Sequence, residues 1–507
     1  TFKPDIYLTA DPKKLSIKLA NTLLDTLENG YELPTLISFL QMFQVGKIEH
    51  LNILNRWKNN DPTKSLATPI GVDTYGELFK LDLHEKFHGP HGLVAGMTGS
   101  GKSEFIMTYI LSLAVNYHPD EVAFILIDYK GGGMAKSFEK LPHVAGIITN
   151  LDGASINRAI VSINSELKRR QRIFDQTSKK TGTSNIDIYK YQKLYREHEV
   201  DEPLPHLFII SDEFAELKSQ RPEFMSELVS AARIGRSLGV HLILATQKPN
   251  GVVDDQIWSN SKFRICLKVQ EKADSMDMLK RPDAAMLKET GRFYLQVGYN
   301  ELFELGQSAW AGAPYYPVDK YVEERDNSVS IIDNNARVLK QVKLNKNKGN
   351  IITPKKQLDA ITMHISSIAE EEHISVKPIW LPPISENILL NEIEEKYNIF
   401  DSQYDIKPVI GEYDDPVNQS QSYLRIPITQ QGNLLVYGSQ GSGKLMLITT
   451  MIYSIINKHT PKEVNLYLLD FESGTLNAFA KAPHIGDVML AYDAEKITNL
   501  FKTLYKE

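Results

Sequence analysis

The sequence predicts an α/β protein in which helices cover both faces of a mostly parallel β-sheet. Near-continuous apolar runs, such as VAFILID at 122–128 and HLFIISD at 206–212, alternate with longer helical patterns, which is typical of buried parallel strands. A glycine-rich loop at 96–103 joins one such strand to a helix, and a similar loop occurs at 438–444. Together these observations predict two related modules in tandem.

Length and composition narrow the class of protein. A chain of 507 residues is long enough for two to four domains, and its 42% hydrophobic residues are ordinary for a globular protein. The net charge of −6 makes nucleic acid an unexpected partner, although a local basic patch is compatible with it. The single cysteine, Cys266, lies in the apolar stretch FRICLKV, which excludes an internal disulfide and indicates a buried thiol in a reducing cytoplasm.

The ends of the chain suggest a piece of a longer protein. It begins at Thr1 rather than Met, and it stops at Glu507 within a helical pattern. No run reaches the roughly 18 apolar residues that cross a bilayer, and there is no signal peptide pattern. We therefore expect any membrane anchor to lie outside this sequence.

Four segments follow one another. Residues 1–68 show helical periodicity in LSIKLANTLLDTLENG and predict a helical lead-in. Strand and helix patterns alternate over 69–325, which we interpret as one complete module. Residues 326–410 are more polar and predict a connector with a few strands, in which the run KLNKNKGNIITPKK is either a solvated loop or a basic binding patch. Residues 411–507 repeat the amino-terminal half of the module.

The repeat is visible residue by residue. The stretches GLVAGMTGSGKSE and LLVYGSQGSGKLM align without a gap, and the separation of Lys102 from Asp128 equals that of Lys444 from Asp470. A strand, a loop, a helix and a second strand are thus all repeated. A duplicated module explains this better than two chance loops.

The first glycine-rich loop fits the pattern G-x-x-x-x-G-K-[ST] and opens the helical run EFIMTYILSLAV. Glycines let successive N–H groups turn inward, and the helix N-terminus adds positive potential, so we expect a cradle for the phosphates of ATP. Lys102 would contact the β- and γ-phosphates, and Ser103 would hold Mg²⁺. The alternative is a plain turn. The expected nucleotide-binding residues are Gly96, Met97, Thr98, Gly99, Ser100, Gly101, Lys102 and Ser103.

Two acids follow the buried strand HLFIIS. Asp212 is suited to share Mg²⁺ with Ser103, and Glu213 is suited to polarise an attacking water. A strand that simply ends in solvated acids is the alternative. The next strand, in GVHLILATQKP, ends in Thr246 and Gln247, either of which would contact the γ-phosphate or the water unless the pair only caps the strand.

Other elements of the site are less defined. The glycines of DYKGGG at 128–133 form either a flexible turn or a loop that shifts with nucleotide state. Phosphoryl transfer also needs positive charge, often from a neighbouring subunit. We expect Arg169 or Arg170, in ELKRRQRIF, to supply it; the other candidates are Arg172, Arg233 and Arg236, and each set would otherwise be a solvated helix face.

In the second loop, Leu445 replaces the hydroxyl residue that should hold the metal, while the glycines and the lysine remain. We expect this loop to bind ATP with little or no turnover, as a regulatory or structural clamp; a relic loop that binds nothing is the alternative. Its expected binding residues are Gly438, Ser439, Gln440, Gly441, Ser442, Gly443 and Lys444.

At these motifs the chain resembles the FtsK/SpoIIIE branch of RecA-like P-loop NTPases, and within it the EssC/EccC ATPases of type VII secretion. The resemblance covers most of residues 69–316. The stretches that carry it are PIGV at 69–72, LDLHEKFHGPHGLVAGMTGSGKSE at 81–104, FILIDYKGGGMA at 124–135, ITNLDG at 148–153, SELKRRQRIF at 165–174, LPHLFIISDEFAEL at 204–217 and GRFYLQVGYNELFELGQSAWAGAPY at 291–315.

The resemblance implies more than the residues do by themselves. It implies a full protein with amino-terminal forkhead-associated domains, transmembrane helices and three ATPase modules, of which this chain holds the second and the first half of the third. It implies a location at the cell membrane, with this part on the cytoplasmic side. It also implies a homo-hexamer that works with other membrane components to export small helical WxG-type proteins.

We therefore expect a motor ATPase whose 69–325 module hydrolyses ATP, slowly unless assembled into a ring. A DNA translocase is the first alternative; the acidic net charge, the duplicated module and the lack of a winged-helix tail in the sequence oppose it. A non-catalytic scaffold that uses nucleotide only to fix its ring is the second.

Overall fold

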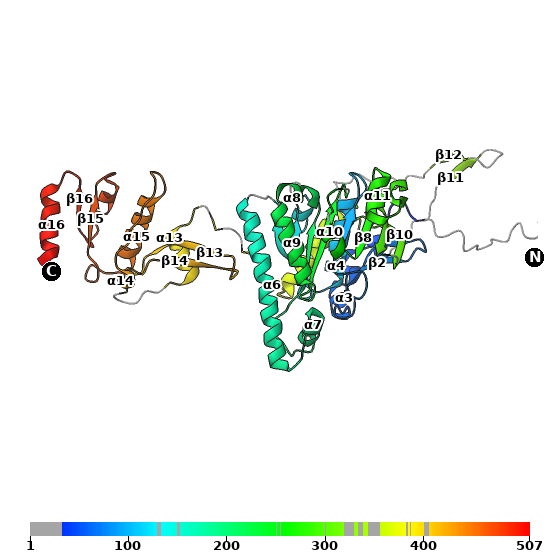
Figure 1. Cartoon of the computed structure of the whole chain (residues 1–507), viewed down its shortest axis with the longest axis horizontal. Coiled ribbons are helices and arrows are strands. Elements are labelled where there is room, and N and C mark those ends of the chain that lie inside the picture. The colour runs from blue at the N-terminus through cyan, green and yellow to red at the C-terminus, as the bar shows by residue number, and fades with distance from the viewer. Residues whose placement is uncertain are drawn as a thin grey trace, which may run out of the picture. The chain divides into compact units, whose positions relative to one another are not determined.

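In the computed structural model the chain divides into two compact units, Thr1–Ile379 and Trp380–Glu507. We refer to them as unit 1 and unit 2, and each is described by itself (Figure 1). The structure describes residues 33–318 apart from 129–132, 150–152, 250, 254 and 300, then 329–332, 338–342, and 355–506 apart from 382–383, 386 and 400–404. The helical pattern expected before residue 33 and most of the lysine-rich run lie outside the described residues.

A ten-stranded sheet forms the centre of unit 1, in the order β2-β1-β10-β9-β8-β3-β7-β6-β4-β5. The strands from β8 to β5 are parallel, and β9, β10, β1 and β2 extend the sheet in antiparallel fashion. The strands are β1 (Ala67–Asp73), β2 (Leu78–Asp82), β3 (Gly92–Ala95), β4 (Val122–Ile127), β5 (Val144–Ile148), β6 (His206–Ser211), β7 (Val240–Thr246), β8 (Phe263–Leu267), β9 (Arg292–Val297) and β10 (Leu302–Ser308).

Helices cover both faces of this sheet because the parallel strands are apolar on both sides; every residue of β3, β4, β6 and β7 is buried. On one face α4 packs against β1, and on the other α8 and α9 pack against β7 (Figure 1). The helices from residue 102 to 279 are α4 (Lys102–Asn116), α5 (Gly133–Lys136), α6 (Gly153–Thr181), α7 (Ile188–Arg196), α8 (Phe214–Gln220), α9 (Pro222–Gly235), α10 (Asp255–Asn260) and α11 (Lys272–Leu279).

Segments before and after the sheet join the same core. Phe39, Leu51 and Trp57 on the amino-terminal side and Leu358 and Ile361 on the carboxy-terminal side are buried in one cluster with α4 and the sheet. Burial of this apolar surface stabilises unit 1 as one body from the start of the described chain to α12. The elements concerned are α2 (Phe39–Met42), η1 (Ile48–Leu51), α3 (Ile53–Asn59) and α12 (Gln357–Glu371).

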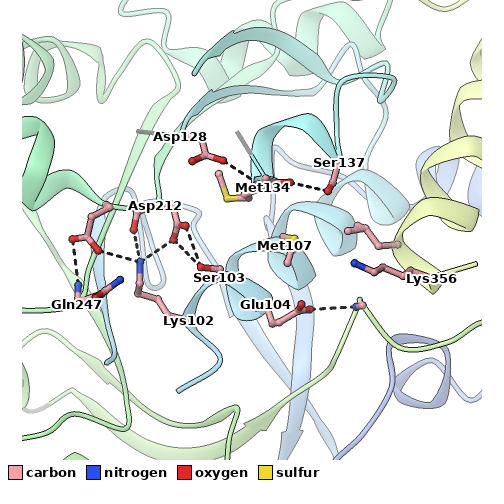
Figure 2. Close-up of a pocket in the computed structure, with 14 residues that line it drawn as sticks. Lys102, Ser103, Glu104, Met107, Asp128, Met134, Ser137, Asp212, Gln247 and Lys356 are labelled. Carbon is pink, nitrogen blue, oxygen red and sulfur yellow. Dashed lines mark hydrogen bonds and ion pairs between the residues drawn. The ribbon is translucent and has the colours of Figure 1, made fainter. Parts of the chain in front are cut away.

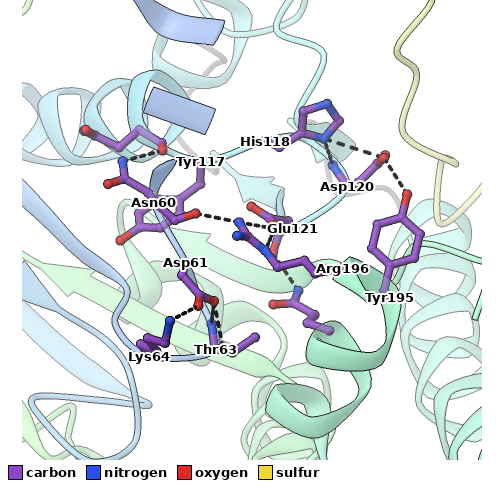
Figure 3. Close-up of polar contacts among 12 residues, drawn as sticks. Asn60, Asp61, Thr63, Lys64, Tyr117, His118, Asp120, Glu121, Tyr195 and Arg196 are labelled. Atoms are coloured by element: carbon purple, nitrogen blue, oxygen red, sulfur yellow. Dashed lines mark hydrogen bonds and ion pairs between the residues drawn. The ribbon is translucent and has the colours of Figure 1, made fainter. Parts of the chain in front are cut away.

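Polar contacts join the segment before β1 to α7 and to the start of β4 (Figure 3). Arg196 at the end of α7 donates from Nε to Glu121 Oε1 at 2.5 Å and from a terminal nitrogen to the carbonyl of Asn60 at 2.5 Å. Tyr195 donates to Asp120 at 3.0 Å. These bonds connect α7, the start of β4 and the loop after α3.

Unit 2 repeats part of this architecture. Helix α15 follows the second glycine-rich loop and has the same length as α4, and β15 and β16 pair in parallel as β4 and β5 do. A two-stranded antiparallel pair, β13 and β14, precedes them. The elements are α13 (Leu390–Tyr397), β13 (Val409–Asp415), β14 (Ser420–Arg425), α14 (Ile428–Gln431), α15 (Lys444–Lys458), η3 (Thr475–Phe479), β15 (Leu466–Asp470), β16 (Ile485–Leu490) and α16 (Ala494–Lys506).

The two units also repeat individual hydrogen bonds. Asp128 Oδ2 accepts from the backbone N–H of Met134 at 3.0 Å, and Asp470 Oδ2 accepts from that of Leu476 at the same distance. A histidine after the helix likewise contacts the carbonyl next to the helix end in both units: His143 with Tyr117, and His484 with His459. The repeat therefore extends to the contacts that set the loops.

The expected fold class, tandem RecA-like modules with helices on both faces of a mostly parallel sheet, is confirmed. One element differs from the repeat. Residues 434–437 align with β3 but form no strand. In unit 1, β3 pairs with β7 and β8, and none of the described strands of unit 2 corresponds to these two partners. None of the described helices combines the length and the apolar character that a bilayer crossing requires. Beyond these modules, the structure has a small hairpin of β11 (Val329–Ile332) and β12 (Val338–Val342).

Candidate functional site

The first glycine-rich loop lies at the edge of the sheet where β3, β6 and β7 end. Gly99 and Gly101 have φ of +81° and +94°, a left-handed conformation that side chains disfavour. A Cβ at Gly101 would also lie 2.9 Å from the backbone nitrogen of Gly291. The loop therefore needs glycine at 101 both for its turn and for its close contact with the chain after α11, and the turn delivers Lys102 to the start of α4.

Lys102, Ser103 and Asp212 converge at this edge. Lys102 Nζ donates to Asp212 Oδ1 at 2.8 Å and also to the carbonyl oxygen of Asp212. Ser103 Oγ lies 3.1 Å from Asp212 Oδ2 and 3.3 Å from Oδ1. The side chain of Lys102 is 6% exposed, so its charge is neutralised by the aspartate instead of by water.

A cavity of about 540 Å³ opens beside these residues. Figure 2 shows Lys102, Ser103 and Asp212 close together, with Gln247 beside them and Glu104 and Lys356 further along the cavity. This space is within the size range of small-molecule and cofactor sites. The lining residues are Lys102, Ser103, Glu104, Met107, Asp128, Gly133, Met134, Ser137, Asp212, Glu213, Gln247, Gly312, Lys356 and Leu358.

Glu213 is buried next to Asp212 and is held from β7. Its Oε1 accepts from Thr246 Oγ1 at 3.1 Å and from the backbone N–H of Gln247 at 3.4 Å, and its Oε2 lies 4.0 Å from Lys102 Nζ. The side chain of Gln247 accepts from Thr98 Oγ1 at 3.0 Å, which joins the glycine-rich loop to the end of β7. The structure thus brings together the residues expected at the ends of two neighbouring strands.

The donor set fits Mg²⁺. This cation takes hard oxygen ligands and is usually held by one or two carboxylates together with substrate phosphates and water. The hydroxyl of Ser103 and the carboxylate of Asp212 lie within 3.1 Å of each other at the wall of the cavity, so one cation can contact both.

The acid of the DYKGGG motif has a structural task. Asp128 accepts from the backbone N–H groups of Met134 and Ala135 at 3.0 and 3.3 Å and so caps the short helix α5. Asp128 and Gly133 line the cavity, while residues 129–132 lie outside the described part of the chain. The carboxylate therefore fixes one wall of the site.

The expected arginines lie in different environments. Arg170 is 1% exposed, and its guanidinium donates to Glu166 at 2.9 Å and to the carbonyl of Leu238 at 2.8 Å. Arg169 bonds Glu166 and Glu202 and is partly exposed. A side chain that acts on a neighbouring copy must reach solvent. Arg170 is buried and does not meet this condition, whereas Arg172, Arg233 and Arg236 are exposed and do meet it.

Two charged residues of the cavity were missed from the sequence. Glu104 is in the first turn of α4, and its carboxylate accepts from the N–H of Gly312 at 3.3 Å; its place directly after Ser103 was the available signal. Lys356 precedes α12, inside a run that resembles a solvated loop, and nothing in the sequence indicated that α12 would pack against α4 and bring it to the cavity (Figure 2).

The second glycine-rich loop keeps the same backbone shape. Gly441 and Gly443 have φ of +79° and +92°, close to those of Gly99 and Gly101. Lys444 Nζ donates to the carbonyls of Gly438 and Ser439 at 2.6 and 3.3 Å. Leu445, 38% exposed, occupies the place of Ser103, so this loop offers backbone N–H groups and a lysine but no hydroxyl for a metal.

Comparison with known proteins identifies relatives over the full chain. The model of the FtsK/SpoIIIE family matches residues 51–251 and 389–507. The type VII secretion system protein EssC of Staphylococcus aureus (strain MRSA252) is 44% identical over 516 residues, covering 99% of this chain and 34% of that protein. The ESX secretion system protein YukB of Bacillus subtilis (strain 168) is also 44% identical, covering 100% of this chain and 33% of that protein. The chain thus spans about one third of the length of these relatives.

Solved structures agree with the fold. The cytoplasmic domain of the Thermomonospora curvata type VII secretion ATPase EccC superimposes with a TM-score of 0.73 at 28% identity, over 91% of this chain and 50% of that one. A structure of EssC (ATPases 2 and 3) from Geobacillus thermodenitrificans gives a TM-score of 0.65 at 18% identity, over 94% of this chain and 76% of that one.

Proposed function

The chain belongs to the FtsK/SpoIIIE family, and from this membership we propose that unit 1 binds Mg²⁺–ATP and hydrolyses it as part of a type VII secretion motor. The observation that carries the proposal is the convergence of Lys102, Ser103 and Asp212 at one cavity, with Glu213 beside them. A triphosphate needs this combination: a lysine for its outer phosphates, oxygen ligands for its cation, and a carboxylate near the attacking water.

Each residue then has a distinct role. The backbone from Gly96 to Gly101 surrounds the phosphates, and Lys102 exchanges its bond with Asp212 for one to the β- and γ-phosphates. Ser103 and Asp212 hold Mg²⁺, which when bound neutralises charge on those phosphates. Glu213 orients and polarises the water, and Gln247 lies where it can contact the water or the γ-phosphate.

Unit 2 serves a different purpose under this proposal. Its loop from Gly438 to Lys444 presents the same cradle, so it binds the phosphates of ATP, but Leu445 gives it no hydroxyl for the cation. We expect binding with little or no turnover, consistent with a regulatory or structural clamp.

The relatives suggest the wider setting. EssC and YukB are named as secretion system proteins, and on that basis we propose that ATP turnover here is coupled to the export of small helical WxG-type proteins across the cell membrane. The chain would act on the cytoplasmic side, as a homo-hexamer, together with other membrane components of the system. A neighbouring copy would supply the arginine that stabilises charge during transfer.

The test of ATP hydrolysis is the Glu213→Gln substitution. We expect turnover to fall by about 10²–10⁴-fold while the affinity for Mg²⁺–ATP stays within about twofold, because the amide cannot polarise water but fills the same space. Glu223→Gln, an exposed residue on α9, is the matched control and should retain full turnover. If the wild type and Glu213→Gln are equally inactive even when forced into hexamers, the ATPase proposal is wrong.

The test of the secretion role compares two partners. The purified chain should bind a helical WxG-type protein in a saturable way and should bind duplex DNA weakly or not at all. Tight DNA binding that weakens with a steep dependence on salt, without binding to the WxG-type protein, would instead favour a DNA translocase.

A further inference from the structure

The two carboxylate oxygens of Glu213 have different surroundings. Oε1 is bonded to β7 through Thr246 Oγ1 at 3.1 Å and the N–H of Gln247 at 3.4 Å. Oε2 lies 4.0 Å from the Nζ of Lys102, at the phosphate end of the cavity. One oxygen is therefore anchored to the neighbouring strand, and the other faces the place where the outer phosphate and the attacking water would lie.

The anchor can be released. The hydroxyl of Thr246 carries one proton but has two acceptors in reach, Glu213 Oε1 at 3.1 Å and the carbonyl of Lys248 at 3.2 Å. The same hydroxyl accepts from the N–H of Lys248 at 3.3 Å, which keeps it beside the loop after β7. When the proton points to Lys248, Glu213 loses its bond from Thr246.

The packing around Thr246 limits what else it can do. The residue is 2% exposed and lies in the last position of β7, so its hydroxyl is shielded from solvent. Among the residues the structure describes, Thr246 does not line the cavity, whereas its neighbour Gln247 does. Its hydroxyl is connected to the cavity through Glu213, whose Oε1 it bonds.

We propose that Thr246 is a positioning residue that fixes the orientation of Glu213 toward the attacking water, and that the backbone carbonyl of Lys248 competes with Glu213 for the hydroxyl proton. The inference rests on the proposed ATPase function. A water-polarising carboxylate is effective only when one of its oxygens is held in line with the water, and loss of alignment by about 1 Å can cost about 10²-fold in rate.

The experiment compares Thr246→Val, which removes the hydroxyl and keeps the branched shape, with Thr246→Ser, which keeps the hydroxyl. We expect Thr246→Val to lower kcat by about 10–100-fold. Both the KM for Mg²⁺–ATP and the Kd for a non-hydrolysable ATP analogue should stay within about twofold of the wild-type values. Thr246→Ser should retain kcat within about threefold. Thr108→Val is the matched control, since it removes an equally buried hydroxyl bond, to the carbonyl of Ala309, away from Glu213.

Other outcomes would overturn the inference. If Thr246→Val keeps the wild-type kcat while Glu213→Gln loses it, the ATPase proposal stands and the positioning role is wrong. If Thr246→Ser loses as much as Thr246→Val, or if Thr108→Val loses as much turnover, the effect is one of general stability. Thermal unfolding of each variant identifies any that do not fold, and Thr246→Ala then repeats the comparison. A wild type without turnover would overturn both proposals.

Discussion

The Glu166→Gln substitution would leave the buried guanidinium of Arg170 without its carboxylate. Arg170 is 1% exposed and contacts Glu166 at 2.9 Å, and its second bond goes to the neutral carbonyl of Leu238. Burial alone would raise the pKa of Glu166, but Arg170 and Arg169 lower it below its usual value, so the pair is ionic. Removing one partner of such a pair costs about 3–5 kcal/mol because an unpaired charge stays in the core.

The expected loss can be measured by urea unfolding. With a slope of about 3 kcal/mol per M, a loss of 3–5 kcal/mol lowers the midpoint by about 1–1.7 M. Three of the four tryptophans, Trp57, Trp258 and Trp310, lie in unit 1, so tryptophan fluorescence mainly follows the unfolding of that unit.

A double variant, Glu166→Met with Arg170→Met, provides the internal check. It removes both charges and leaves the Leu238 carbonyl without this donor, so it should recover part of the loss, with about 1–3 kcal/mol remaining. Glu202→Gln is the control, because Glu202 is a half-exposed partner of Arg169 whose loss should cost no more than about 1 kcal/mol.

Two results would refute this reasoning. The first is an unchanged midpoint for Glu166→Gln. The second is a double variant less stable than the single one, which would mean that the pair itself stabilises the fold strongly.

The same variants also address the role of Arg170. If Arg170→Met abolished turnover without any change in the free energy of unfolding, a direct catalytic role on a neighbouring copy would replace the structural one.

Three further predictions follow from the same contacts. Burial lowers the pKa of His241 to about 3 and that of its partner His206 well below the usual 6.5. Below about pH 6.5 only the unfolded chain gains these protons, so the free energy of unfolding should fall by about 1.4 kcal/mol per pH unit for each histidine. The His241→Phe substitution should reduce this dependence on pH. Gly101→Ala should weaken nucleotide binding more than Gly99→Ala, whose added Cβ meets nothing within 4 Å; equal effects would contradict the steric reason. Ser103→Ala should raise the Mg²⁺ concentration needed for half-maximal turnover, and an unchanged requirement would show that Ser103 is not a ligand.

Strands and loops with a strong local signal could be predicted from the sequence. The parallel strands are continuous apolar runs because both of their faces are buried, and the glycine-rich loop is dictated by the positive φ of Gly99 and Gly101. The convergence of Ser103 and Asp212 also followed, since the carboxyl ends of parallel strands meet at one edge.

Features that depend on long-range packing could not be predicted. The motif ELKRRQRIF gives Arg169 and Arg170 the same local pattern. Only the packing of α6 against α9, with Arg170 bonded to the carbonyl of Leu238, decides which of the two is buried. Strand β1 lies far from its antiparallel partner β10 along the chain, so this pairing left no local pattern. Lys356 reaches the cavity for the same reason.

The bonds between Lys102 and Asp212 have a consequence for the order in which ligands enter. The ammonium of Lys102 donates to both the carbonyl and the carboxylate of Asp212, and the hydroxyl of Ser103 donates to the same carboxylate. A free divalent cation would have to displace the lysine from Asp212, so it should bind poorly before ATP does. Phosphates that draw the ammonium away would uncover the carboxylate, so we expect the cation to bind together with the nucleotide.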